Sequence, residues 1–576
     1  MTKLMLGNEA VARGLLEAGC HHVFSYPGTP STEITEAAAT YTEIDAEWAP
    51  NEKVALEAAI GASIAGARAF CAMKHVGLNV SADPLFTAVY TGTRGGLVVA
   101  VADDPGMHSS QNEQDTRQVA IAAKIPVLEA CDSMECKELV VKAFEISEEF
   151  NLPVILRLTT RVAHSRSLVT LGEIKEIGLK DFTKDPQKYV MVPANAKNRR
   201  IDLETRLKKI EEYSETSGIN SIEDGEKLGF IASGISRLYV KEVAKENAGL
   251  LHLRMLNPLP KEMIKSFSKN YDRIIVAEEL DPVIENCCKT LGIECDGKSI
   301  FPSYGEYSRR LISEKLGYSI PETYEFTEEI PLRPPVLCSG CPHRGLFLTL
   351  RKLGVFVSGD IGCYSLGAAY PLLAMDTCIC MGASVSSLHG ILKARPDCSD
   401  KAVAVIGDST FMHSGITGLI DIVYNRSNAT VIILDNRTTG MTGHQNNPTS
   451  GYDAKGREAP EVNLVALAKA CGVKRVKVVD PYNLKETEET IKEELKADEP
   501  SVIVAKRQCV LLKNFRKESY CFVKKEECKN CKVCISCGCP TISMGDNTAY
   551  INKDTCTGCG VCKQVCPFGA IGEERV

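Results

Sequence analysis

The sequence lacks long apolar runs: no segment reaches the roughly 18 uninterrupted apolar residues that a membrane-spanning helix needs. Residues 1–10 show no apolar stretch before a small-residue cleavage site, so we expect no signal peptide and a cytoplasmic protein. Low-complexity segments and short repeats are also missing, and there is only one tryptophan, Trp48. These absences exclude membrane-spanning, fibrous and disordered classes.

Basic residues are too few for a typical nucleic-acid-binding protein, which would carry a clustered basic face. The formal net charge is −7, and 44% of residues are hydrophobic while 24% are charged. This balance favours a globular enzyme that acts on small molecules. A length of 576 residues predicts about three or four domains.

Cysteine is abundant and unevenly distributed. The chain has 25 cysteines, and nine of them lie in residues 528–566. In a long chain without an export signal, such cysteines indicate metal binding and redox chemistry more often than disulfides. The other sixteen are scattered, and we expect most of them to be small buried residues.

The tail contains two cysteine runs of bacterial ferredoxin type. Residues 556–567 read C-x2-C-x2-C-x3-C-P, and residues 528–540 hold a stretched version of the same pattern. Because the fourth cysteine of each run ligates the other run's cluster, we predict two [4Fe–4S] clusters. One set is Cys528, Cys531, Cys534 and Cys566; the other is Cys539, Cys556, Cys559 and Cys562. Cys537 is an alternative to Cys539, and structural zinc is the alternative metal.

Apolar strand-like runs alternate with amphipathic stretches before this tail, which predicts an α/β fold with parallel sheets. The predicted order is a doubly wound domain over 1–165, a charged helical linker without strands over 166–225, a small α/β domain over 226–330, a second doubly wound domain over 331–512, and the ferredoxin-like tail over 520–576. The proline-rich segment Ile330–Pro335 marks one boundary.

Polar residues follow two predicted strands of the second large domain. Gly407-Asp408-Ser409 comes after AVAVI, and Asp435-Asn436 comes after VIIL. Such turns bring backbone N–H groups toward a phosphate, and the side-chain oxygens of Asp408 and Asn436 suit Mg²⁺. The alternative is ordinary turn chemistry. Gly359-Asp360 and Gly382-Ala383-Ser384 also follow strand-like runs and strengthen the prediction of a phosphate site.

The spacing of the two signals resembles the Gly-Asp-Gly and Asn motif of thiamine diphosphate enzymes, with Ser409 in place of the last glycine and Asp435 in place of an asparagine. This resemblance implies thiamine diphosphate and Mg²⁺ as cofactors in the two large domains. It also implies the carbonyl of Thr438 as a third metal ligand. His343 is a candidate to approach the diphosphate, and a structural histidine is the alternative.

The segment Tyr26–Ser31, YPGTPS, resembles a loop of 2-oxoacid:ferredoxin oxidoreductases. With the domain order, it makes the whole chain similar to the alpha subunits of indolepyruvate ferredoxin oxidoreductases. That resemblance implies oxidative decarboxylation of an arylpyruvate with coenzyme A, with electrons passed to ferredoxin. It also implies a beta subunit as partner, in a heterodimer or an α2β2 assembly.

The same resemblance assigns two catalytic residues. Thr29 would face the cofactor and the substrate carboxylate, and Glu52 would activate the aminopyrimidine ring of thiamine diphosphate. Glu57 is the competing carboxylate, and an acid that complements the helix dipole is the alternative role of Glu52. Lys74-His75 and residues 109–112 follow strands where substrate contacts are common, but the sequence assigns them no role.

In pyruvate-type relatives, four further cysteines hold a cluster beside the thiazolium ring. Cys338, Cys341, Cys363 and Cys509 stand at matching places, so a third cluster is one possibility and a zinc or structural role is the other. Two rival functions also remain open. One is a non-oxidative thiamine enzyme, against which the tail argues; the other is an electron-transfer subunit with vestigial thiamine domains. The sequence does not distinguish aryl from other 2-oxoacids.

Overall fold

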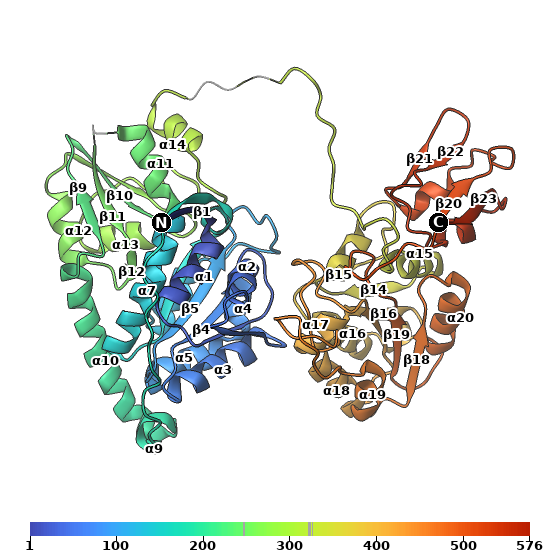
Figure 1. The fold of residues 1–576 in the computed structure, drawn as a ribbon, viewed down its shortest axis with the longest axis horizontal. Helices are drawn as coiled ribbons and strands as arrows, with labels where there is room; N and C mark the ends of the chain where they lie inside the picture. Colours follow the sequence, from blue (N-terminus) through green and yellow to red (C-terminus); the bar gives the residue numbers. More distant parts are fainter. Residues whose placement is uncertain (246–247, 321–323, 325) are drawn as a thin grey trace. The chain divides into compact units, whose positions relative to one another are not determined.

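The structure, a computed structural model, describes residues 1–245, 248–320, 324 and 326–576. The chain forms two compact units, Met1–Phe326 and Thr327–Val576, which are described separately (Figure 1). The division lies beside the predicted proline-rich boundary at 330–335. Within the described ranges, every helix is too short or too polar to cross a bilayer.

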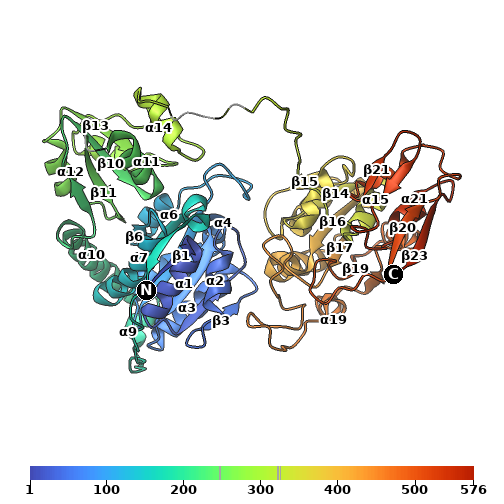
Figure 2. The same ribbon diagram turned by 45° about the horizontal axis from the view of Figure 1, so that its top comes forward.

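A seven-stranded sheet forms the centre of the first unit. Its spatial order is β12 (Met255–Asn257), β6 (Val127–Glu129), β7 (Val154–Thr159), β5 (Leu97–Asp103), β4 (Ala69–Lys74), β2 (His22–Ser25) and β3 (Asp45–Trp48). All neighbouring strands are parallel except β12, which pairs antiparallel with β6. Helices α1 (Gly7–Glu17), α3 (Glu52–Ile64) and α7 (Ser133–Phe150) pack around this sheet (Figure 2).

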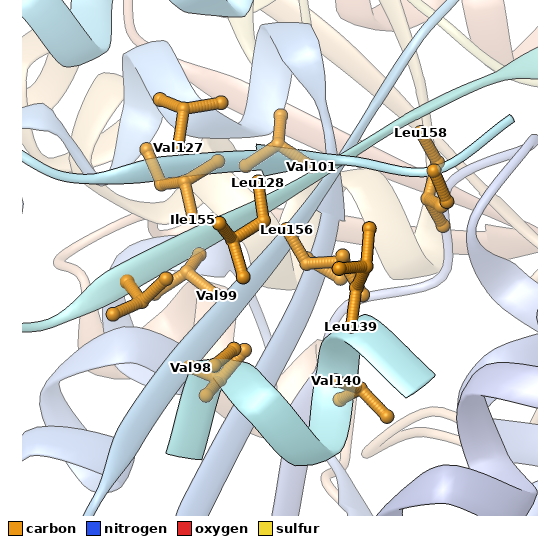
Figure 3. Close-up of a cluster of buried hydrophobic side chains, with 14 of the residues drawn as sticks. Val98, Val99, Val101, Val127, Leu128, Leu139, Val140, Ile155, Leu156 and Leu158 are labelled. Carbon is orange, nitrogen blue, oxygen red and sulfur yellow. The ribbon is translucent and has the colours of Figure 1, made fainter. Parts of the chain in front are cut away.

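The central strands and helix α7 share one buried core (Figure 3). Every residue of β5, LVVAVAD, is buried, as expected of a parallel strand covered on both faces. Val98, Leu139 and Leu156 belong to this core, and burying each such side chain contributes about 1.5–3 kcal/mol. The strand ends that carry polar residues are therefore fixed on a rigid base.

A small sheet completes the first unit, and three of its four strands lie within residues 226–330. Its order is β13 (Arg273–Ala277), β10 (Leu228–Ser233), β11 (Ala248–Leu253) and β9 (Ser221–Glu223). Immediately after β11, the short strand β12 leaves this sheet and joins the large one. The small domain is thus tied into its neighbour by a strand that no periodicity in the sequence indicates.

The prediction that residues 166–225 contain no strand is wrong at both ends. Strand β8 (Arg166–Thr170) pairs antiparallel with β1 (Thr2–Leu6), and β9 pairs antiparallel with β11. Between them lies the helix α10 (Pro193–Thr216), which is charged over most of its surface. These strands are short, and partners distant in sequence stabilise them rather than local patterning.

A six-stranded parallel sheet forms the centre of the second unit. Its order is β15 (Thr377–Cys378), β14 (Phe356–Gly359), β16 (Ala402–Gly407), β17 (Thr430–Asp435), β19 (Ser501–Lys506) and β18 (Arg475–Val479). Strands β14, β16 and β17 coincide with the predicted strand-like runs that lead to Gly359, Gly407 and Asp435. Since the strands are parallel, their carboxyl ends meet at one edge, next to helices α15 (His343–Leu353) and α16 (Ala383–Ala394).

The cysteine-rich tail shares its core with this α/β part. Its strands pair antiparallel, β20 (Ser519–Val523) with β23 (Ile571–Arg575) and β21 (Ile542–Met544) with β22 (Ala549–Ile551). The buried tail residues Cys534 and Val561 lie in one hydrophobic cluster with Phe347 and Val405. The tail therefore belongs to the second folded unit and is not a module of its own.

A buried ionic network connects the two sheets of the first unit. Arg117, on helix α6 (Thr116–Ala123), is fully buried and lies 2.6 Å from both Asp115 and Glu278. Arg157, on β7, lies 2.7 Å from Asp103. Glu278 follows β13 of the small sheet, so these ion pairs span both sheets. Buried charges are tolerated because each has a partner.

Replacing Arg117 with methionine removes the nearest cation from two buried carboxylates, Asp115 and Glu278. We expect Arg117→Met to lower the free energy of unfolding of the first unit by about 3–5 kcal/mol. Urea unfolding followed by the fluorescence of Trp48, the sole tryptophan, measures this unit. The matched change at the exposed Arg310 should stay within about 0.5 kcal/mol. Equal unfolding midpoints for both variants would contradict the role of the network.

Candidate functional site

Asp408 and Asn436 lie together at the carboxyl edge of the second unit's sheet. Strands β16 and β17 are adjacent and pair Gly407 with Leu434, so the residues that follow each strand meet. The Asp408 carboxylate accepts hydrogen bonds from the backbone N–H of Ser409 at 2.8 Å and of Arg437 at 3.0 Å. The predicted juxtaposition is therefore present, and the loop after β17 folds back onto Asp408.

The electrostatics of this edge favour a cation. Burial, with the nearby Asp435 carboxylate as the second cause, raises the pKa of Asp408 to about 7. Asp435 Oδ1 is buried and has no hydrogen-bond partner among the described residues. Carboxylate and amide oxygens are the donors that Mg²⁺ prefers, and the metal would relieve the repulsion between these two groups. The residues present thus fit a magnesium-bound diphosphate.

His343 orients Asn436. The Asn436 side-chain nitrogen Nδ2 lies 3.3 Å from His343 Nε2, at the start of α15. Burial lowers the pKa of His343 to about 4, so the ring is neutral and accepts this hydrogen bond. The amide oxygen Oδ1 then points to the opposite side, where it accepts the backbone N–H of Thr438 at 3.1 Å. His343 therefore acts through Asn436.

Asp360 organises the start of helix α16. Its carboxylate is fully buried and accepts the backbone N–H groups of Gly382 and Ser384, both at 2.9 Å. Gly382 has a φ of 86°, and a Cβ there would meet Ser414 at 2.6 Å, so glycine is required. A Cβ on Gly359 would likewise lie 2.5 Å from the Met375 side chain. Asp360 holds the loop, since its oxygens are already engaged.

Sequence reasoning missed two residues of this site. Thr449 Oγ1 donates a hydrogen bond to Asp408 Oδ2 at 3.0 Å, and Thr439 Oγ1 donates one to Ser409 Oγ at 2.9 Å. Both lie in the long segment after β17, which has no regular secondary structure until helix α19 (Leu464–Ala470). The turn residues of NNPTSG, 446–451, were the available signal, because polar loops of this kind carry ligand contacts.

Two cavities in the tail gather the two predicted cysteine sets. The cysteines lining one cavity are Cys528, Cys531, Cys534 and Cys566. Those lining the other are Cys539, Cys556, Cys559 and Cys562, together with Cys521 and Cys537. The exchange of the fourth cysteine between the runs is thus present in the fold. The donor sets fit iron–sulfur cubanes, which bind four thiolates.

Cys521 and Cys537 are additional thiols around the second cavity. The backbone N–H of Cys521 lies 3.3 Å from Cys556 Sγ, which suits a donor to a ligating sulfur. Burial raises the pKa of Cys537 to about 12, whereas Cys539 is partly exposed. Both Cys537 and Cys539 line the cavity, so the alternative between them stays open.

A third group of cysteines lies beside residues 436–440, the loop that follows β17. Burial, and after it the charges of Cys509 and Cys338, raises the pKa of Cys363 to about 11. The pKa of Cys341 is likewise raised by burial and, to a smaller extent, by the charges of Cys363 and Cys338. A Cβ added to Gly440 would lie 3.3 Å from Cys363 Sγ and 3.8 Å from Asn436 Nδ2. The four cysteines at the matching places are therefore neighbours in space.

Arg344 connects this group to the tail. Its buried guanidinium donates to the carbonyl of Cys537 at 2.7 Å, to that of Leu337 at 2.6 Å and to that of Cys338 at 3.0 Å. Arg344 also follows His343 directly in α15. Arg344 thus joins the C-x2-C loop to the second tail cavity. The adjacent His343 contacts Asn436 at the carboxyl edge of the sheet.

A basic cavity of about 1490 Å³ opens within the second unit, between the segment that follows β17 and the tail. Its cationic lining residues are Arg437, Lys506, Arg507, Lys513 and Arg516, and its aromatic ones are Tyr452, Tyr482 and Phe515. Arg507 stacks 4.5 Å from the centre of the Tyr482 ring. The cavity also reaches Cys559. It suits a large anionic ligand with an aromatic group.

In the first unit, Glu52 and Glu57 have different environments. Glu52 begins helix α3, is 4% exposed, and lies so close to Gly77 that a Cβ there would be 2.6 Å from its Oε1. Glu57 is 46% exposed at its side chain and forms an ion pair with Lys53 on the helix surface. Of these two glutamates, only Glu52 is buried away from solvent, where its carboxylate can act on a bound ring.

The Tyr26–Ser31 loop lies beside Lys74. An added Cβ on Gly28 would lie 3.6 Å from the Lys74 side chain, and Lys74 Nζ donates to the carbonyl of Ser109 at 3.1 Å. Ser109 Oγ in turn donates to the carbonyl of Thr29 at 3.2 Å. Burial lowers the pKa of Lys74, while Asp104 and Glu52 oppose this shift. Lys74 and Ser109, to which the sequence assigns no role, are thus linked by hydrogen bonds to the half-buried residue Thr29.

The raised pKa of Asp408 predicts a pH-dependent cation affinity. Below about pH 7 a proton competes with the metal for this carboxylate, so binding of Mn²⁺ as a probe should weaken by up to about tenfold per pH unit. Electron paramagnetic resonance of free Mn²⁺ measures this affinity. Asp408→Asn should abolish binding, and Asp397→Asn, an exposed control, should not. An affinity that does not change between pH 8 and 6 would contradict the assignment.

Three known protein families match the chain. The C-terminal TPP-binding domain of thiamine pyrophosphate enzymes matches residues 360–505, and the thiamine diphosphate-binding domain of pyruvate flavodoxin/ferredoxin oxidoreductases matches residues 13–213. The 4Fe-4S binding domain matches residues 549–572. These matches confirm the predicted fold class and fall on the strand edge, the Glu52 region and the tail described above.

Three curated relatives illustrate the similarity. The chain is 39% identical to indolepyruvate oxidoreductase subunit IorA of Archaeoglobus fulgidus, over 98% of this chain and 97% of that protein. It is 42% identical to the protein of the same name from Pyrococcus horikoshii, over 99% and 97%. It is also 27% identical to 2-oxoglutarate synthase subunit KorA of Archaeoglobus fulgidus, over 52% of this chain and 96% of that one.

The first two matches extend over nearly the full length of both chains, and they include the thiamine-type domains as well as the cysteine-rich tail. The chain therefore belongs to the family of indolepyruvate oxidoreductase subunit IorA, a thiamine-dependent oxidoreductase family of the 2-oxoacid:ferredoxin type.

Proposed function

We propose that this chain oxidatively decarboxylates indolepyruvate and other arylpyruvates. The arylpyruvate, coenzyme A and two oxidised ferredoxins give the aryl-acetyl-CoA, CO2, two reduced ferredoxins and a proton. One observation carries the proposal: the diphosphate-type strand edge and two cysteine-lined cavities share one hydrophobic core. A decarboxylation site and an electron outlet in one folded unit favour an oxidative reaction over a non-oxidative one.

The cofactor-binding residues follow from the geometry of the edge. Asp408, Asn436 and the carbonyl of Thr438 would hold Mg²⁺, and the glycines 359, 382 and 407 would let the diphosphate approach the backbone. Ser384 and Ser409 would contribute polar contacts. Bound thiamine diphosphate supplies a carbanion-stabilising ylid. The intact oxygen-donor set argues against a vestigial thiamine domain.

Glu52 is the residue that we propose to exchange a proton with the aminopyrimidine ring. Its burial next to Gly77 keeps the carboxylate away from water, so a ring nitrogen can form a short hydrogen bond with it. Thr29 would place the substrate carboxylate, with Lys74 supplying positive charge nearby. The half-buried position of Thr29 leaves its side chain room for such a contact.

The thiols of the second unit would hold the electron path. We assign Cys528, Cys531, Cys534 and Cys566 to one [4Fe–4S] cluster, and Cys539, Cys556, Cys559 and Cys562 to the other. We also propose a third cluster on Cys338, Cys341, Cys363 and Cys509. Cys363 lies beside Gly440, in the loop after β17, and the carbonyl of Cys338 accepts a hydrogen bond from Arg344. Electrons would then reach ferredoxin through clusters held by one folded unit.

The substrate and partner assignments rest on the names of the relatives. Two of them are called indolepyruvate oxidoreductase subunits, which supports an arylpyruvate as substrate and a second, beta-type subunit as partner, in a heterodimer or an α2β2 assembly. A relative named for 2-oxoglutarate covers only half of this chain, so another 2-oxoacid is the alternative substrate. We place the reaction in the cytoplasm.

Coenzyme A is the ligand that we propose for the basic cavity. Its phosphates match the lysine and arginine lining, and its adenine matches Tyr452, Tyr482 and Phe515. The cavity starts at Arg437, directly after Asn436, so a thiol carried from it would arrive near the cofactor. Ion pairs engage three of the cations: Arg437 with Glu461 at 2.7 Å, Arg507 with Asp480 at 3.0 Å and Lys506 with Asp435 at 3.8 Å. Lys513 and Arg516 are therefore the principal phosphate ligands in this proposal.

Removal of the Glu52 carboxylate tests the thiamine step. We expect Glu52→Gln to lower turnover of indolepyruvate by about 10²–10⁴-fold, because proton transfer to the cofactor ring is lost. The assay is anaerobic, coenzyme A-dependent reduction of a viologen dye by the complex with the partner subunit. Glu57→Gln serves as the control and should keep its rate. A Glu52→Gln enzyme as active as wild type would refute this role.

Removal of charge from the cavity tests the coenzyme A assignment. We expect Lys513→Ala and Arg516→Ala each to raise the KM for coenzyme A by about 10-fold or more, the effect of losing one charge-assisted hydrogen bond. The KM for the 2-oxoacid should not change. Lys485→Ala, at a residue 85% exposed on helix α20 (Leu484–Glu494), is the matched control. If wild type and the three variants had the same KM for coenzyme A, coenzyme A would not bind in this cavity.

A further inference from the structure

Three potential metal ligands meet in the first unit, apart from the residues of the proposed reaction. Cys131 follows strand β6, Glu135 lies in the first turn of α7, and His252 lies on β11. One ligand atom from each lies within 4.8 Å of the others, and all three residues are buried. Strand β6 and helix α7 belong to the large domain, whereas β11 belongs to the small sheet. The group therefore joins two domains of one unit.

His252 is the feature that points to a ligand. The residue is 0% exposed, and neither Nδ1 nor Nε2 has a hydrogen-bond partner among the described residues. Nearly all buried polar groups in proteins are hydrogen-bonded, so two unused ring nitrogens require an explanation. Burial keeps the imidazole neutral by lowering its pKa to about 3. A neutral imidazole is the commonest metal ligand among side chains.

The Glu135 carboxylate is already oriented for a metal. Its Oε2 accepts the backbone N–H of Cys131 at 2.9 Å, and its Oε1 accepts Arg254 Nε at 2.7 Å while lying 3.7 Å from His252 Nδ1. Outer hydrogen bonds of this kind fix the ligating carboxylate in many metal sites. Arg254 would act as that outer partner.

The surrounding charges are balanced. The cations whose charge reaches the group are Arg237 and Arg254, and the carboxylates besides Glu135 are Asp132 and Glu223. A divalent ion bound by the Cys131 thiolate and the Glu135 carboxylate would be neutral as a set. Without a metal, Cys131 is a protonated thiol. Its proton is released to solvent when the metal binds.

We propose that Cys131, Glu135 and His252 bind a divalent ion of the zinc type. Sulfur, imidazole nitrogen and carboxylate oxygen together are the donor set of zinc, which takes four ligands in a tetrahedron, and a water completes the three protein ligands. The ion would fasten β11 to the β6–α7 connection, next to the point where β12 joins the large sheet. The burial of all three ligands and their position between two domains favour a structural role, independent of the proposed reaction, for an ion whose fourth position is held by a water.

Metal analysis of the full-length chain, purified anaerobically, tests this site. We expect about one zinc per chain in addition to iron, and X-ray absorption at the zinc edge should show one sulfur at about 2.3 Å with lighter ligands at about 2.0–2.1 Å. Cys131→Ser and His252→Gln should lose the zinc. Cys136→Ser changes another buried cysteine of α7 and should retain it.

A replacement that keeps a ligand guards against variants that fail to fold. His252→Cys should retain zinc and add a second sulfur to the absorption spectrum, and the fluorescence of Trp48 reports whether each variant's first unit is folded. The proposal is overturned if wild type holds no zinc or other transition-metal ion besides iron in stoichiometric amount. It is also overturned if folded Cys131→Ser and His252→Gln keep their zinc, or if Cys136→Ser loses it as well.

Discussion

The buried guanidinium of Arg344 is the interaction on which the second unit's arrangement depends. It donates to backbone carbonyls of the C-x2-C loop and of the tail, while its neighbour His343 holds the side chain of Asn436. A guanidinium at 2% exposure needs several acceptors, because an unpaired buried cation is expensive. The C-x2-C loop and the tail must therefore meet at Arg344, and the adjacent His343 ties the strand edge that carries Asn436 to the same helix. Cofactor edge and cysteine cavities are fixed relative to one another by that requirement.

Much of this architecture is predictable from the sequence because it depends on local rules. The strand runs ending in GDS and DN predict where Asp408 and Asn436 meet, since parallel strands share a carboxyl edge. The ferredoxin spacing likewise predicts the exchanged cysteine sets that line the two tail cavities. These features follow from short-range pattern and from the chemistry of the ligand atoms.

Other features depend on partners far apart in the chain and could not be predicted. Strand β12 is three residues long and exists because β6 offers an edge, and β8 exists because β1 does. The contacts of Thr449 with Asp408, and of Arg344 with Cys537, link residues 41 and 193 positions apart. Burial also separates Glu52 from Glu57, which the sequence leaves as alternatives. Packing supplies this information, and periodicity does not.

The proposed function requires that electrons from the 2-oxoacid enter clusters held by the same chain. Rapid-freeze electron paramagnetic resonance of the anaerobic complex, mixed with indolepyruvate in the absence of ferredoxin, tests it most directly. We expect signals of reduced [4Fe–4S] clusters that appear with the release of CO2, and the loss of these signals when the cysteines of the tail cavities are replaced by serine. Release of CO2 at the same rate while every cluster stays oxidised would contradict it.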